Sequence, residues 1–259
     1  MRRRRTIVAL ALAIALSAGR TAAAAPGDAQ AAFRAAFGAE PVRHVVQPSH
    51  PPGAAKGDNY GEDAVDLTLK PGLLAPLGGE RYALVASETN VMGAHASPGA
   101  VAIAYLRRTG GRWTVEKTWP EFIWSGNSGN PADAIKILSF SKTPMVALAS
   151  DFMGGGQATD TTWIIRLDAT GPKYVGQVPS GGRVEPEDTC DDCAPYEYRG
   201  SIGPPRRRGD ALSVTYAGRV RTAHGRWRPI HRKVDFRLRD GELVPTTRLV
   251  LPWLTLGGG

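Results

Sequence analysis

Hydrophobic and polar residues alternate along two segments near the C-terminal end of the chain. Val234, Phe236 and Leu238 alternate with charged residues, and a similar period-two pattern covers residues 211–219. Such alternation is typical of a β-strand with one face on a core and one face in water. Four other runs are apolar at consecutive positions, which is typical of strands covered on both faces. These runs are 82–86, 101–106, 145–148 and 163–167.

Gly and Pro residues separate these runs, and the chain beyond residue 60 has no long helical period. The pattern predicts an all-β fold built as an antiparallel meander. A meander of this length can form a β-sandwich, an open barrel or a propeller-like array of sheets, and these alternatives stay open. The predicted strands are 63–68, 81–88, 100–107, 112–118, 134–140, 145–152, 161–167, 173–178, 196–202, 211–219, 226–238 and 242–249.

The N-terminal segment has the composition of a secretory signal peptide. Four arginines at positions 2–5 precede an apolar stretch from Ile7 to Ala18, and alanines occupy positions 22–25. The apolar stretch is shorter than a membrane-spanning helix. We expect residues 1–25 to be cleaved, leaving a periplasmic or secreted protein without a transmembrane segment. An uncleaved anchor is the alternative, and the choice between general and twin-arginine export stays open.

A short helix is expected after the signal peptide. Asp28 is suited to cap a helix over residues 29–37, and Gly38 is suited to end it. Phe33 and Phe37 are four residues apart and therefore share one face, which we expect to pack on the main body.

Three regions follow from these patterns. Residues 1–25 form the signal peptide, and residues 26–60 form the short helix and a Pro/Gly-rich linker, of which 44–57 is either linker or a loosely held strand. Residues 61–259 form a single β-rich domain.

The charge of the chain is unevenly distributed. The sequence has 32 basic and 24 acidic residues, but five of the arginines lie in the predicted signal peptide. Residues 26–198 have a net charge of −6, and residues 199–259 have a net charge of +9. Two interpretations stay open: solvated faces of one sheet, or a basic patch for an anionic partner. In an exported protein such a partner is a cell-envelope component rather than nucleic acid.

The basic residues concentrate around one predicted hairpin tip at His224-Gly225. Arginines two residues apart share a strand face, so we expect two same-face pairs beside this tip. Trp227 lies on the opposite face of its strand from its neighbouring arginines, and we expect it in the core. Arg206–Arg208 lie at the other end of the meander, which predicts only weak, salt-sensitive binding of anionic polymers. The arginines expected to contact an anion are Arg219, Arg221, Arg226 and Arg228.

Alternate connections of a meander lie at the same end, which places the long connections together. Binding residues concentrate on such loops. The long connections are 89–99, 119–133, 153–160 and 179–195. The candidate ligand-binding residues at this end are His95, Trp124, Asn127, Asp151, Gln157, Asp160 and His224.

Cys190 and Cys193 form a C-x-x-C motif within an acidic segment. A short-loop disulfide is the expected state in an exported protein. A redox pair and half of a zinc site are the alternatives, but the five carboxylates within residues 185–192 disfavour a reactive thiolate. Calcium ligation is disfavoured because the segment lacks a regular ligand series.

No catalytic motif is recognisable, and we expect no cofactor or metal. The glycines at 154–156 lack the Lys-Ser/Thr pair of a phosphate loop, and residues 125–129 lack the spacing of a nucleophile elbow. The sequence therefore favours an exported, non-catalytic binding or interaction domain. The alternatives are a secreted hydrolase or metal-dependent enzyme built from His95, Asp151, Asp160 and His224, and a structural envelope protein.

Overall fold

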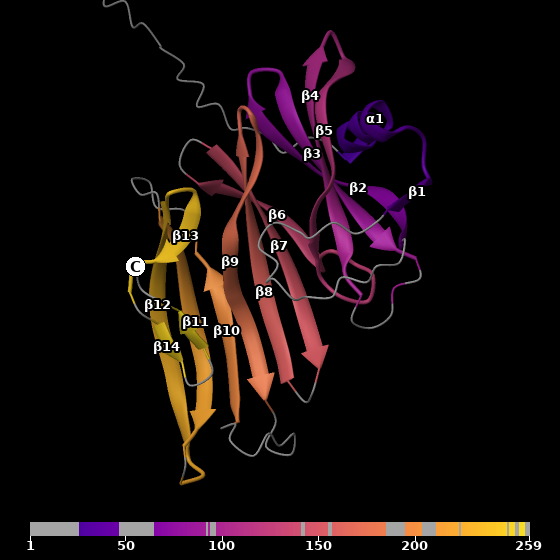
Figure 1. The fold of residues 1–259 in the computed structure, drawn as a ribbon. Helices are drawn as coiled ribbons and strands as arrows, with labels where there is room; N and C mark the ends of the chain where they lie inside the picture. Colours follow the sequence, from indigo (N-terminus) through magenta and orange to yellow (C-terminus); the bar gives the residue numbers. More distant parts are fainter. Residues whose placement is uncertain are drawn as a thin grey trace, which may run out of the picture.

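The computed structural model has two large antiparallel sheets, a small two-stranded sheet and one short helix over its described residues, which confirms the all-β fold (Figure 1). In each sheet, hydrogen-bonded neighbours are consecutive in the chain, as expected for a meander. The two sheets pack face to face, and the larger one curls into a half-barrel. The structure describes residues 26–46, 65–91, 93, 97–140, 143–154, 157–184, 195–203, 211–222, 224–247, 249–251 and 254–256.

The smaller sheet has five strands in the order β1 to β5. The strand β1 lies at one edge and pairs with β2, so the loosely held strand is the interpretation that fits the first part of the 44–57 segment. The strands are β1 (Val42–Val46), β2 (Val65–Gly78), β3 (Arg81–Asn90), β4 (Gly99–Thr109) and β5 (Arg112–Ser125).

The larger sheet has eight strands in the order β13 to β6, and a separate two-stranded sheet pairs β14 (Leu249–Leu251) with β15 (Leu254–Leu256). We call β6–β9 the covered half and β10–β13 the projecting half of the larger sheet. The strands are β6 (Ala134–Phe140), β7 (Thr143–Gly154), β8 (Gln157–Asp168), β9 (Gly171–Val184), β10 (Tyr196–Ile202), β11 (Ala211–Arg221), β12 (Trp227–Arg239) and β13 (Glu242–Pro245).

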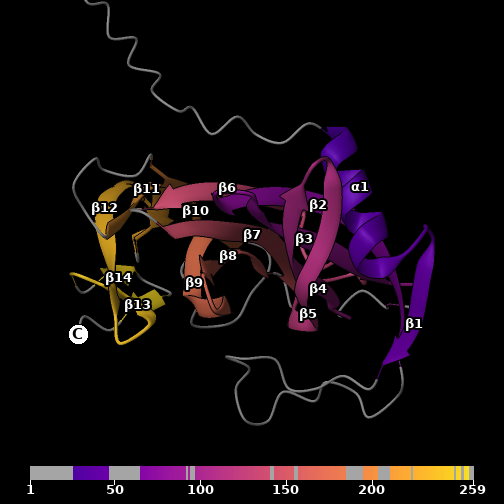
Figure 2. The ribbon, with the colours of Figure 1, turned by 90° about the horizontal axis from the view of Figure 1, so that it is seen from above.

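The helix α1 (Pro26–Phe37) packs on the face of the five-stranded sheet that points away from the eight-stranded sheet (Figure 2). Phe33 is fully buried there, and its ring centroid lies 5.4 Å from that of Phe37. The predicted cap is wrong, because the helix begins at Pro26 and Asp28 lies in its first turn. The Asp28 carboxylate pairs instead with Arg108, at 3.0 Å. The helix ends before Gly38, whose φ of 99° explains the glycine.

Strands with continuous apolar runs separate two cores, as the sequence predicts. In β4, Ile103 faces the eight-stranded sheet, while the neighbouring Ala102 and Ala104 face α1. In β7, Val146 packs towards the five-stranded sheet, and Met145 packs into the curled half-barrel. The middle strands are therefore buried on both faces, which accounts for their lack of polar positions.

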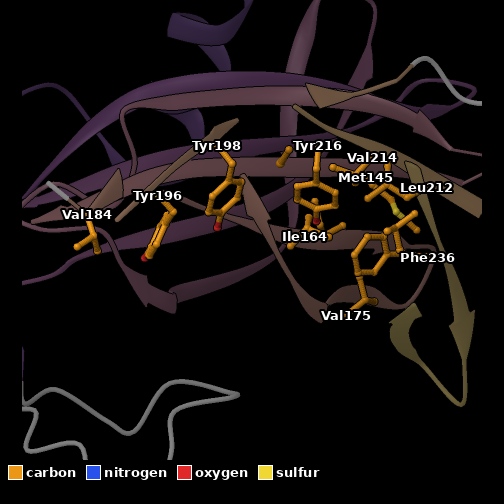
Figure 3. Close-up of a cluster of buried hydrophobic side chains, with 13 residues drawn as sticks. Met145, Ile164, Val175, Val184, Tyr196, Tyr198, Leu212, Val214, Tyr216 and Phe236 are labelled. Atoms are coloured by element: carbon orange, nitrogen blue, oxygen red, sulfur yellow. The ribbon is translucent and has the colours of Figure 1, made fainter. Parts of the chain in front are cut away.

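The concave side of the half-barrel holds a third core. It combines residues of the covered half with the inward-facing residues of the alternating strands β11 and β12. Figure 3 shows Tyr196, Tyr198 and Tyr216 in a row along this core, with Phe236 at one end. The alternation in β12 thus corresponds to one buried and one exposed face, whereas in β11 the polar Ser213 is buried as well.

Two strands are longer than the sequence predicts. Each continues past its predicted last residue and includes a proline in the added part. Beyond residue 68, β2 continues across a bulge beside Gly72, at which an added Cβ would lie 2.5 Å from the Val85 carbonyl oxygen. Beyond residue 118, β5 continues across an irregularity that accommodates Pro120 and the positive φ of Glu121. Because β5 is an edge strand, Pro120 removes no essential ladder hydrogen bond.

Candidate functional site

The described parts of two predicted long connections, 89–99 and 119–133, meet at one end of the molecule, whereas 153–160 is mostly strand because β7 continues to Gly154 and β8 begins at Gln157. The Asn90 amide donates to the Gly129 carbonyl at 2.8 Å, and the Gly129 amide donates to the Ser97 carbonyl at 2.7 Å. The Asn127 side-chain amide donates to the backbone carbonyl and to the carboxylate of Asp151 in β7. These bonds fix the loops of the five-stranded sheet against the end of the eight-stranded sheet.

Two of the predicted ligand-binding carboxylates are direct neighbours at this end. Asp151 and Asp160 are cross-strand partners in β7 and β8, and Asp133 accepts a hydrogen bond from the Asp151 amide. Burial raises the pKa of Asp160, and the charge of Asp151 raises it further, while Arg199 has the opposite effect. The Asp160 carboxylate lies over Gly181, where an added Cβ would be 2.1 Å from Oδ2. Among the described residues, no group of three or more His, Cys, Asp and Glu side chains is placed to hold a metal ion.

The remaining candidates are not brought to this pair within the described chain. Trp124 is buried in a small cluster with Leu67 and Ala100. Gln157 begins β8, but its side chain lies outside the described part. His224 is exposed at the β11–β12 tip and is separated from β8 by β9 and β10. His95 and both cysteines lie outside the described residues, so the predicted disulfide stays a prediction.

A buried carboxyl group that the sequence analysis did not identify lies in the five-stranded sheet. Glu88 in β3 is 0% exposed, and its pKa is raised to about 8. Burial is the largest cause and the Glu121 carboxylate adds to it, while the Glu121 backbone amide acts in the opposite direction. The Nε2 atom of His44 lies 3.8 Å from Glu88 Oε1 and 3.4 Å from Glu121 Oε1. Glu88 follows Leu84 and Ala86 at spacings of two, and this parity is the signal that identifies its buried face.

The basic hairpin tip presents arginines on both faces. Cross-strand partners share a face, and the register pairs Arg221 with Trp227 and Val220 with Arg228. Arg219 and Arg221 therefore lie on the exposed convex face of the projecting half. Arg228 lies on the opposite face, and Arg226 is exposed in the turn just before β12.

The expected core position of Trp227 is wrong: this side chain is 40% exposed. Trp227 is the cross-strand partner of Arg221 and lies seven residues before Val234, so its side chain is on the convex face and not on the face that packs in the core. The Arg219 guanidinium lies 4.6 Å from the Trp227 ring centroid and also pairs with Glu197 at 3.0 Å. Exposed Trp and Arg side chains thus form one stacked unit at the tip.

A hollow with a volume of about 330 Å³ lies at the other end of the five-stranded sheet, away from the Asn127–Asp151 contact. Glu80, Tyr82 and Arg108 line it, together with two turn glycines. Its arginine is paired with Asp28 and stacks on Trp113 at 5.2 Å. The hollow thus has one arginine beside the carboxylate of Glu80, whereas residues 219–228 have four arginines and no acidic residue, so the hairpin tip is better suited to an anion.

Comparisons with protein-family models, with curated proteins and with solved structures found no match. In the described part of the chain, no helix is long and apolar enough to cross a membrane.

Proposed function

We propose that this protein is an exported, non-catalytic β-rich binding domain that attaches to an anionic component of the cell envelope through the tip of the β11–β12 hairpin. The basic and apolar pattern of residues 1–25 supports export. Residues 219–228 contain four arginines and no acidic residue, and this concentration at one exposed tip is the observation that carries the proposal.

The arrangement of the polar candidates supports binding rather than catalysis. General acid–base chemistry needs its groups within hydrogen-bond reach of one substrate. Asp151 and Asp160 are adjacent, but His224 is separated from them by two strands. Glu88 and His44 lie in the other sheet, and the Glu88 carboxyl is inaccessible to solvent.

Retention on immobilised heparin across a salt series tests the proposal. We expect binding that weakens by on the order of tenfold between ~50 and ~200 mM salt, because exposed ion contacts are screened. Replacing Arg219, Arg221, Arg226 and Arg228 together by Gln should abolish retention. The matched control replaces four exposed cations elsewhere, Arg112, Lys117, Lys136 and Arg239, and removes the same net charge.

Two results would overturn the proposal. One is the absence of binding to both heparin and anionic vesicles at ~50 mM salt, where electrostatic attraction is strongest. The other is equal loss of binding in the tip variant and the control variant, because net charge alone would then explain retention.

A further inference from the structure

We propose that the anionic component is a phospholipid surface, which the β11–β12 hairpin contacts with its tip so that Trp227 lies at the level of the headgroups. This inference rests on the proposed function and names its partner. It is carried by the reach of the hairpin, by the placement of its arginines and by the exposure of its tryptophan.

The hairpin extends past its neighbours in the sheet. Among the described residues, the last hydrogen bond of β11 to its neighbour in this direction joins the Arg221 amide to the carbonyl of Pro195, which directly precedes β10. Beyond this row, the turn is held by its own bonds, in which the Thr222 amide donates to the Arg226 carbonyl and the Gly225 amide donates to the Thr222 carbonyl, each at 2.8 Å. Figure 1 shows this tip projecting beyond the ends of the adjacent strands. A flat surface therefore meets the tip before the rest of the sheet.

The arginines surround the tip instead of lining one groove. Arg219 and Arg221 point to the convex face, and Arg228 points to the opposite face. A polymer lying along one face would contact one of these sets only. A planar array of phosphates approached by the tip contacts both sets, and guanidinium groups bind phosphate oxygens in a bidentate manner. Anionic headgroups provide such a plane, which attracts clustered Lys and Arg side chains.

Trp227 adds an apolar contact at the same level. Trp, with its apolar ring and polar N–H group, is enriched at membrane–water interfaces. The Arg219 guanidinium over its ring places a cation beside the indole. Arg221, the cross-strand partner of Trp227, lies on the same face, and its Nε donates to the Gly225 carbonyl in the turn at 3.3 Å. This combination suits the boundary between headgroups and acyl chains.

An alternative is that a strand of a partner protein pairs with the edge of β12 near the tip, but this part of the hairpin is poorly suited to such pairing. Among the described residues, β12 pairs with β13 only over Phe236–Arg239. Nearer the tip, β12 carries Pro229, which has no N–H group, directly after the exposed Arg228, and the exposed Arg232 and Lys233 follow along the strand. Proline and charged side chains are features that prevent pairing at a sheet edge.

Vesicle flotation with the full mature chain tests the inference. The probes are vesicles of phosphatidylcholine alone and of phosphatidylcholine with ~30% phosphatidylglycerol, at a salt concentration where charge screening is weak. We expect binding only to the anionic vesicles. Brominated acyl chains should quench the wild-type tryptophan fluorescence, and the quenching should be largely lost in Trp227→Phe. Trp227→Ala should lower vesicle affinity at least about fivefold while retaining heparin binding, because it removes only the apolar anchor.

The outcomes separate this inference from the proposed function. Binding to heparin without binding to anionic vesicles overturns the lipid partner and leaves the proposed function standing. Binding to neither probe overturns both. Equal binding to neutral and anionic vesicles, or quenching that persists in Trp227→Phe, overturns the proposal that the hairpin contacts the lipid surface with its tip. Thermal unfolding of each variant establishes that the exposed substitutions leave the fold intact.

Discussion

The two halves of the eight-stranded sheet have strands of similar length but different surroundings. In the covered half, the five-stranded sheet packs on one face and the curled sheet encloses the other. In the projecting half, the enclosed face is apolar where Leu212, Val214, Val234 and Phe236 lie, and the outer face of β12 carries exposed charged side chains. The comparison teaches that solvation, rather than strand geometry, determines which residues each half tolerates.

Ionisable side chains also differ in burial between the covered and the projecting parts of the molecule. Among the described residues, Glu88 is the one Asp, Glu, Lys, Arg or His side chain in the buried set, and it lies in the covering five-stranded sheet. The projecting half instead exposes its arginines, where each interacts with water and contributes little to stability. Substitutions in the two regions should therefore differ strongly in their effects on the free energy of unfolding.

The largest expected effect comes from removing the buried carboxyl group. The pKa of Glu88 rises from 4.5 to about 8, so between these values folding requires a proton that the unfolded chain does not hold. Wild-type stability from this group is present below pH 4.5 and is lost as the pH rises to about 8, by about 1.4 kcal/mol per pH unit. Glu88→Gln should therefore match the wild type near pH 4 and exceed it by about 4 kcal/mol near pH 8.

Urea unfolding of both proteins across that pH range provides the measurement. Glu242→Gln, an exposed glutamate in β13, is the matched control and should leave the pH profile unchanged. Parallel profiles for the wild type and Glu88→Gln would contradict the buried, protonated state.

The second prediction compares the two halves directly. Leu148 is fully buried between the sheets, so Leu148→Ala should lower the free energy of unfolding by about 3 kcal/mol. Lys233→Ala, on the exposed face of β12, should change it by less than about 0.5 kcal/mol. Chemical denaturation measures both, and similar losses would mean that the projecting half is covered in solution.

The third prediction concerns the close contact between β8 and β9. An added Cβ at Gly181 would overlap the Asp160 carboxylate, so Gly181→Ala should destabilise the protein by about 1–2 kcal/mol. In a protein that already carries Asp160→Ala, Gly181→Ala should lower the free energy of unfolding by much less. A double-mutant cycle measures this coupling, and an additive result would show that the two side chains do not compete for this space.

The smallest effect is expected at the surface of the projecting half. Arg219 and Glu197 are half-exposed partners at 3.0 Å, and separating them should cost less than about 1 kcal/mol. Arg219→Ala should accordingly leave thermal unfolding nearly unchanged while it weakens binding to heparin and anionic vesicles. A large decrease in the unfolding temperature of Arg219→Ala would instead show that the stacked Arg219 and Trp227 side chains are buried as part of the core.

Much of the fold was predictable because it depends on local pattern. The alternation in β12 and the apolar runs of β4 and β7 depend on strand faces, which the sequence displays directly. The extension of β2 was not predictable, because Gly72 is needed only where the Val85 backbone approaches. The exposure of Trp227, in contrast, follows from the alternation of β12, because Trp227 lies an odd number of residues from Val234 and Phe236, which face the core.

For the candidate site, the sequence predicted only those positions that follow from the order of the strands. The meander placed Asn127, Asp151 and Asp160 at one end, and the structure joins them there. The burial of Glu88 depends on His44 and Glu121, which come from the two edge strands. Spacing along the chain contains no information about such contacts.

The consecutive strand order also has a consequence for assembly during synthesis. Every strand that pairs within the five-stranded sheet ends by Ser125, so the ladder of this sheet can form before the remainder of the chain exists. Such local pairing favours rapid folding. Val85 and Ile103 would nevertheless stay uncovered until Val146 and Ile165 arrive from β7 and β8. The nascent chain therefore passes through an interval with an exposed apolar sheet face, when it is most prone to aggregate or to engage a chaperone.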